Sequence, residues 1–103
     1  MNDLAKAAAA AFAKPFGGLI RLEPEGEPAL WVDGRAFPPE IGAGPPGGAD
    51  EAPVCVWRAS RDTLMRIFEG ERLLASAYVS GRLSIAGDMS IMARLHLERG
   101  PRG

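Results

Sequence analysis

The sequence predicts an α+β domain with a mostly antiparallel sheet of four to five strands, and three observations lead to that prediction. Strands and helices are partly segregated along the chain. Short alternating segments such as LIRLEP and RLSIA are typical of half-buried strands. Capping residues and glycines mark the ends of the helices. Because 103 residues suffice for one hydrophobic core, we predict a single domain over residues 1–103.

Composition narrows the classes of function. Hydrophobic residues make up 47% of the chain and charged residues 24%, which is ordinary for a globular protein. The formal net charge of −1 gives no overall field that would recruit nucleic acid, so no nucleic-acid partner is expected. Cys55 is the only cysteine, which excludes a disulfide within the chain and fits a reducing compartment. No signal peptide or membrane span is recognised, so the sequence predicts a cytoplasmic protein.

The N-terminal third predicts one helix and two strands. The helix is expected to run to about Lys14 and to lean on the rest of the protein through Phe12, since its other side chains are mostly alanines. Alternation in LIRLEP and ALWVD then predicts two strands joined by an EGEP turn. Val32 lies on the apolar face of the second strand.

The middle of the chain, residues 38–53, is rich in proline and glycine. Proline cannot sit in a central strand, so FPPEI is at best an edge strand and GAGPPGGADEAP is expected to form a flexible surface loop. VCVWR follows and is apolar on both faces. This pattern suits a central strand covered on both sides or a strand beneath a helix.

The C-terminal half contains two segments with unusually wide apolar arcs. Ser60 caps a first, ordinary helix that ends at Gly70. Residues 71–80 are then expected to form another helical turn or two, closed by Gly81. Residues 88–99 are expected to form the last helix with Asp88 as its N-cap, and the strand RLSIA lies between the two segments. Around the axis of each of these two segments, apolar side chains cover an arc roughly twice as wide as the usual apolar face of about 100°. Two interpretations stay open: burial between the sheet and another helix, or a pocket wall for an apolar ligand.

Few residues suggest catalysis or metal binding. His96 is the only histidine, and its place in an apolar arc favours a neutral, hydrogen-bonded side chain. With no histidine or cysteine cluster, no transition-metal site is expected. Cys55 lies in an apolar strand and is predicted to be a structural thiol. We therefore predict no enzyme, no catalytic residue, no metal and no cofactor.

The segment ASRDTLMRIFEGERLLASAYVSGRLSIAGDMSIMARL resembles the second half of the sterol carrier protein 2 family. The shared features are a capped helix ending in glycine, a stretch with a small residue, a glycine turn before a short strand, and a Gly-Asp pair before the final apolar helix. They fall at Ser60, Gly70, Ala77, Gly81, Leu83, Ile85, Gly87, Asp88 and Leu95. The resemblance implies helices over one face of a sheet, enclosing an apolar tunnel for sterols, fatty acids or acyl-CoA, without catalytic chemistry. Some bacterial relatives assist isoprenoid-quinone biosynthesis.

The arcs and the resemblance together define a predicted site. The tunnel would be lined by Val32, Trp57, Phe68, Leu73, Leu74, Ala77, Tyr78, Ile85, Met89, Met92 and Leu95. Arg58 and Arg61 are candidates for contact with a carboxylate or phosphate headgroup. The expected partner is a small hydrophobic lipid, bound by a monomer or homodimer that contacts a membrane or a lipid enzyme only transiently. The rival is an interaction or homodimerisation module, in which the arcs and WVDGRAF form a partner surface.

Overall fold

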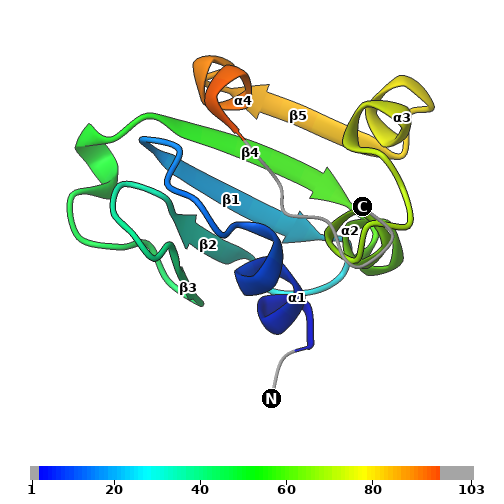
Figure 1. Ribbon diagram of the computed structural model, residues 1–103, viewed down its shortest axis with the longest axis horizontal. Helices are drawn as coiled ribbons and strands as arrows, with labels where there is room; N and C mark the ends of the chain where they lie inside the picture. The colour runs from blue at the N-terminus through cyan, green and yellow to red at the C-terminus, as the bar shows by residue number, and fades with distance from the viewer. Residues whose placement is uncertain (1–2, 96–103) are drawn as a thin grey trace.

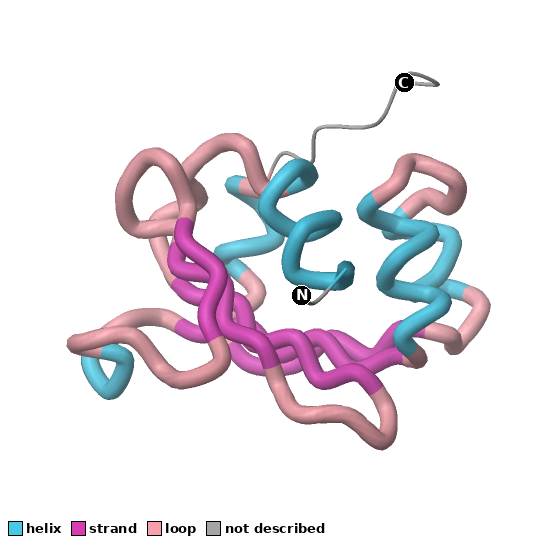
Figure 2. Tube along the Cα trace, turned by 90° about the horizontal axis from the view of Figure 1, so that it is seen from below, coloured by secondary structure: helices cyan, strands magenta, loops and turns pink. Residues whose placement is uncertain are grey.

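A five-stranded sheet carries four α-helices on one of its sides in the computed structural model, which describes residues 3–95 (Figures 1 and 2). The predicted α+β class is confirmed. In chain order the elements are α1 (Asp3–Ala11), β1 (Leu19–Pro24), β2 (Leu30–Asp33), β3 (Glu40–Gly42), the 3₁₀ turn η1 (Ala49–Glu51), β4 (Val54–Ala59), α2 (Arg61–Phe68), α3 (Leu74–Val79), β5 (Leu83–Gly87) and α4 (Ser90–Arg94).

The sheet has the strand order β3-β2-β1-β4-β5. The β1–β4 pair is parallel and the other three neighbouring pairs are antiparallel, so the mostly antiparallel sheet is confirmed. The register places Ile20 between Val32 and Cys55, and Leu22 beside Trp57. These five apolar side chains are fully buried, and together they form the part of the core contributed by the central strands.

The two faces of the sheet differ, as strand alternation predicts. Trp57 is buried on the helix-covered face, whereas Arg58, the next residue of β4, is exposed on the outer face. On that outer face the Arg58 guanidinium donates to Glu23 Oε1 at 2.7 and 2.9 Å. Of the two interpretations of VCVWR, the strand beneath helices is therefore confirmed, and the strand covered on both sides is wrong.

The first two helices form where the sequence predicts them. α1 buries Leu4, Ala8 and Ala11 and is followed directly by the buried Phe12. It ends before Lys14, in keeping with the bias against helical backbone just before a proline. α2 is capped by the Ser60 hydroxyl, which accepts the Thr63 N–H at 3.1 Å. This cap and the packing of α2 against α1 fix the two helices relative to each other, with α1 in front of the sheet and α2 at the ends of β1 and β4 (Figure 1).

The segment 71–80 contains the expected helical turn or two, but it is less buried than its apolar arc predicts. The N–H groups of Glu71 and Arg72 both donate to the Arg66 carbonyl, at 2.8 and 3.2 Å, so these residues complete the end of α2 and α3 begins only at Leu74. The wide apolar arc is not enclosed: of the residues in α3, only Ala77 is buried. Leu73, Tyr78 and Val79 are exposed instead, at 55%, 50% and 83% of their full areas.

The last helix is shorter than predicted. α4 ends at Arg94, because Leu95 has extended backbone. The Asp88 carboxylate accepts the Ser90 N–H at 3.0 Å and the Ser90 hydroxyl at 2.6 Å, so it caps this turn as expected, two residues ahead of the helix. The predicted continuation to residue 99 and His96 lie outside the described residues.

The proline-rich segment 38–53 contributes one edge of the sheet. β3 pairs antiparallel with β2, which confirms FPPEI as an edge strand at most. The rest of the segment contains η1 and turns. The opposite edge of the sheet is β5, with α3 at its start and α4 at its end (Figure 1).

Two glycines that bracket β5 provide a first prediction. Gly81 and Gly87 both have left-handed backbone, with φ of +81° and +94°. A Cβ at Gly81 would meet no atom within 4 Å, whereas one at Gly87 would collide with the Val54 carbonyl oxygen. Gly81→Ala should therefore lower the free energy of unfolding by about 1–2 kcal/mol through the backbone alone. Gly87→Ala should cost at least ~1 kcal/mol more, because the β4 backbone must also move. Urea unfolding of both variants checks the order, and equal losses would contradict it.

Candidate functional site

Four aromatic rings occupy the centre of the helix-covered face. Phe12 is the hub, with ring centroids 5.7 Å from Phe16, 5.7 Å from Trp57 and 5.3 Å from Phe68. Trp57 and Phe68 stack at 6.3 Å with an interplanar angle of 24°. We call these four residues the aromatic cluster. It joins the end of α1, the segment before β1, the middle of β4 and the end of α2, so it lies where the implied tunnel would run.

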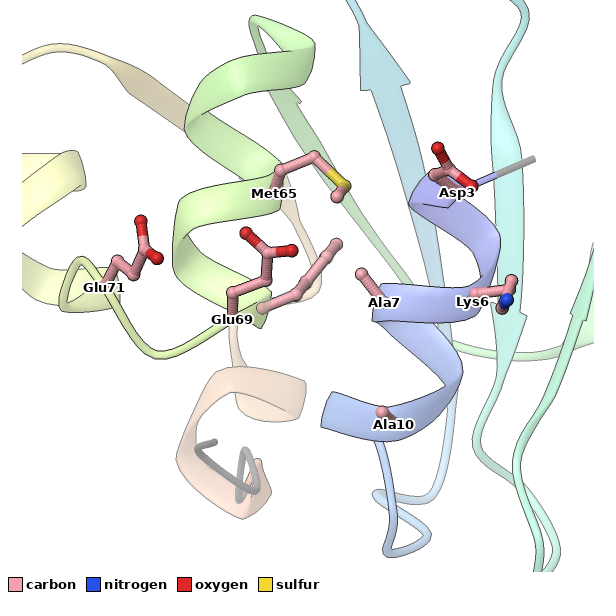
Figure 3. A pocket seen from close by; sticks show the side chains of 8 residues that line it. Asp3, Lys6, Ala7, Ala10, Met65, Glu69 and Glu71 are labelled. Atoms are coloured by element: carbon pink, nitrogen blue, oxygen red, sulfur yellow. The ribbon is translucent and has the colours of Figure 1, made fainter. Parts of the chain in front are cut away.

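An open groove of about 670 Å³ lies between α1 and α2. Ala7 and Ala10 line it from α1, while Met65 and Glu69 face them from α2 (Figure 3). The alanines let the two helices present a hollow rather than interdigitated side chains. The groove therefore has small and flexible apolar walls with charged groups at its rim.

Phe68 lies between the groove and the other three rings of the aromatic cluster. Its side chain lines the groove and is only 3% exposed, and it also contacts both Phe12 and Trp57. Phe68 is therefore part of the groove wall on one side and of the apolar core on the other.

The aromatic cluster contains an unpaired polar group, the Trp57 indole N–H. Trp57 is fully buried, and its Nε1 forms no hydrogen bond with any part of the chain that the structure describes. The Cys55 thiol, on the same face of β4, is close enough for the indole to lower the thiol's pKa slightly, but sulfur is a weak acceptor and no bond of normal geometry forms. A buried donor without a partner costs about 1–3 kcal/mol and calls for an explanation.

Cys55 itself is buried, and its surroundings disfavour the thiolate. Burial is the main cause that raises the pKa of its thiol, and the negative charge of Asp88 raises that pKa further. The thiolate is the reactive form of cysteine, so both effects suppress reaction at neutral pH. The predicted structural thiol is consistent with this environment.

A second prediction follows for alkylation of Cys55. At pH 8 the native protein should react with iodoacetamide at least ~100-fold more slowly than the urea-unfolded protein, because the raised pKa and burial both act. Mass spectrometry over a time course measures the two rates. Rates within a few-fold of each other would contradict the buried, protonated thiol.

The structure divides the predicted tunnel residues into three groups. Those fully buried are Val32, Trp57, Phe68 and Ala77. Those half-buried and packed against the core are Leu74, Ile85, Met92 and Leu95. Those exposed are Leu73, Tyr78 and Met89. The first two groups surround the same core, whereas the exposed three are not brought to it.

Neither candidate headgroup residue faces the apolar interior. Arg58 lies on the outer face of the sheet, opposite to the face that holds Trp57, and pairs with Glu23 at 2.7 Å. Arg61 begins α2 and pairs with Glu27 at 2.7 Å. Both guanidinium groups therefore lie among the carboxylates of the EPEGE turn rather than at the groove.

The residues that sequence reasoning missed come mainly from α1 and the segment that joins it to β1, with one more from α2. The aromatic cluster includes Phe16, and the groove is lined by Ala7, Ala10 and Met65. None of these four residues was among the predicted tunnel residues. Phe12 was expected only to anchor α1. Its aromatic spacing to Phe16 was the one available signal, and it does not reveal that Phe68 packs against the same ring.

Within residues 3–95, no three histidine, cysteine or acidic side chains gather as a metal site would require. In the same part of the chain, none of the helices has both the length and the apolar character needed to cross a membrane.

Fold and core together define a small α+β domain with helices over one face of a mixed five-stranded sheet. The sequence profile of the SCP-2 sterol transfer family matches residues 1–96. The chain belongs to this family, as the resemblance implied. A search of proteins of curated function finds no match.

Solved structures support the same fold. Apo sterol carrier protein 2 from Yarrowia lipolytica is similar with a TM-score of 0.60 at 18% identity, covering 90% of this chain and 80% of that one. Sterol carrier protein 2 like 2 from Aedes aegypti is similar with a TM-score of 0.58 at 16% sequence identity, and the match covers 87% of this chain and 82% of that one. A structure described as the UbiJ-SCP2 ubiquinone synthesis protein is similar with a TM-score of 0.57 at 20% sequence identity, and the match covers 91% of this chain and 75% of that one. At these identities the likeness establishes the fold.

Proposed function

We propose that this protein is a non-catalytic carrier that binds a single hydrophobic lipid between the sheet and the helices. Membership of the SCP-2 family supports lipid binding in general. The observation that carries the specific proposal is the aromatic cluster, which adjoins an open groove through Phe68 and contains the unpaired Trp57 N–H. In this proposal the lipid chain enters at the groove and displaces Phe68.

The Trp57 donor gives the ligand a fixed orientation. A carboxylate, hydroxyl or carbonyl oxygen on the lipid would accept from Nε1, while the chain contacts the apolar residues that the sequence predicted, among them Ala77, Ile85 and Met92. Pockets of this kind combine an apolar lining with a few polar groups that orient the ligand. Fatty acids, sterols and isoprenoid quinones all meet this description, and the last class is suggested by the similarity to the UbiJ-SCP2 ubiquinone synthesis protein. We place the carrier in the cytoplasm, where a single reduced cysteine is ordinary.

The two tryptophans make the proposal directly testable. Trp57 is in the core, whereas Trp31 lies on the outer face with the Arg21 guanidinium 5.6 Å from its ring. In a Trp31→Phe protein, a fatty acid carrying a nitroxide on its chain should quench Trp57 fluorescence saturably, at about one equivalent per chain. The matched control, Trp57→Phe, retains only Trp31 and should show little quenching.

The proposal fails if Trp57 is not quenched by any of the three lipid classes at tens of micromolar protein. It also fails if Trp31 and Trp57 are quenched equally, because that result would indicate nonspecific surface adsorption. An unlabelled lipid should reverse the quenching of Trp57 by competition.

A further inference from the structure

The two edges of the sheet are protected to very different degrees. β3 is only three residues long, begins with the exposed Glu40 and follows Pro38 and Pro39, all of which discourage pairing with another strand. β5 has the sequence LSIAG, with no proline and no charge between its ends. Among residues 3–95, no strand pairs with its outer side.

The register shows which backbone groups β5 presents at that edge. The Asp88 N–H donates to the Val54 carbonyl at 2.9 Å, and Ala86 and Ser84 lie opposite Val56 and Arg58. Hydrogen-bonded pairs alternate in an antiparallel ladder, so Ser84 and Ala86 bond to β4. The N–H and C=O groups of the alternate residues, Leu83, Ile85 and Gly87, therefore point away from the sheet.

We propose that β5 pairs antiparallel with β5 of a second copy of this chain, about a two-fold axis at Ile85. In this register Ile85 lies opposite its own copy, and Leu83 lies opposite Gly87 of the second copy. The paired residues are those whose N–H and C=O groups point outward. The pairing therefore gives these groups hydrogen-bond partners and leaves the hydrogen bonds between β5 and β4 unchanged. Closed two-fold symmetry also leaves no further β5 edge open.

Charge complementarity favours this register. The same axis places Arg82 directly opposite Asp88 of the second copy, twice per dimer. Both side chains are exposed in the single chain. The two hydrogen bonds that Asp88 accepts from Ser90 go to Oδ1, so Oδ2 can accept from a further donor. Opposite charges facing each other across strands stabilise the pairing, whereas like charges oppose it.

The exposed apolar residues support the same occupant. Of the five exposed large hydrophobic residues in the described chain, four lie in the segments on either side of β5: Leu73, Tyr78, Val79 and Met89. The two-fold axis brings the α3 end of one copy to the α4 end of the other, on the same side of the extended sheet. Ile85, half-buried on that side, would be covered by its own copy.

A charge-exchange experiment tests the register. The parent protein should sediment at twice its 10.9 kDa mass at high concentration. Arg82→Glu and Asp88→Lys should each raise the dimer dissociation constant at least ~10-fold, because each places like charges opposite each other twice. An equimolar mixture of the two variants should dimerise again, since both facing pairs are then of opposite charge. This recovery also shows that both variants are folded.

A third variant tests the backbone contacts. Ile85→Pro removes an N–H that points away from β4, so the sheet should persist by circular dichroism while the dimer is lost. The proposal is overturned if the parent stays monomeric up to several hundred micromolar, or if it dimerises but the charge mixture does not recover. None of these outcomes depends on lipid, so the test is independent of the proposed carrier function.

Discussion

Replacing Phe12 with alanine is expected to lower the free energy of unfolding by about 3–5 kcal/mol, which is among the largest effects of any single substitution in this chain. Phe12 is 1% exposed and contacts the other three rings of the aromatic cluster. It is also the only large side chain besides Leu4 that fixes the alanine-rich α1 to the core. Its loss leaves a cavity and detaches the helix at the same time.

Thermal unfolding of the lipid-free protein measures the effect. For a domain of this size each 1 kcal/mol lowers the melting temperature by about 4–8 °C, so a decrease above ~12 °C is expected. The matched control is Phe37→Ala, because Phe37 is 71% exposed and should change stability by less than ~0.5 kcal/mol. Similar losses in the two variants would show that Phe12 is not the hub of the core.

Ligand binding adds a second measurement on the same variant. If the lipid occupies the space around the aromatic cluster, the cavity left by Phe12→Ala should be filled by the lipid chain. A saturating fatty acid should then raise the melting temperature of the variant more than that of the parent, because ligand that binds only the folded state stabilises it by mass action. An equal increase in both proteins would place the lipid elsewhere.

The strands could be predicted from sequence because each carries its own signal. Ile20 and Leu22 alternate with Arg21 and Glu23, and the sheet has these pairs on its buried and outer faces. Ser60 and Gly70 likewise fix the ends of α2 by local chemistry, a side-chain cap and a left-handed φ of 80°. In such elements the local pattern and the tertiary packing agree.

The C-terminal helices were predicted less well because apolar content does not specify burial. Tyr78 and Val79 have the composition of a core helix, yet they are exposed. The turn that closes α2 takes up Glu71 and Arg72 through bonds to the Arg66 carbonyl, and no helix periodicity reports this competition. If the proposed dimer forms, these residues are apolar because a second copy covers them.

The site was predictable only in the part that β4 and α2 contribute. Trp57 and Phe68 were identified from β4 and α2, but the cluster also needs Phe12 and Phe16, which α1 brings from the other end of the chain. Contacts between residues so far apart in sequence depend on topology rather than on any local pattern. The groove arises in the same way, from α1 packing beside α2.

Trp57→Phe is expected to lower the affinity for a fatty acid about tenfold while changing the stability of the lipid-free protein by less than ~1 kcal/mol. The stability change is small because two terms oppose each other. The smaller ring leaves unfilled volume, which destabilises the core. At the same time the variant removes a buried N–H that has no partner, which relieves an existing cost.

In the change of affinity, no second term opposes the loss of the indole N–H. Comparing ligands with and without a polar group shows whether this lost hydrogen bond causes the weaker binding. A fatty-acid probe should lose affinity because its carboxylate no longer receives the indole N–H, whereas a probe with the same chain but no oxygen should bind both proteins equally. Trp31→Phe serves as the control and should leave both affinities unchanged. If the two probes lose affinity to the same extent, Trp57 contributes shape alone. The unpaired donor would then be a cost that the fold tolerates without using it to orient a ligand.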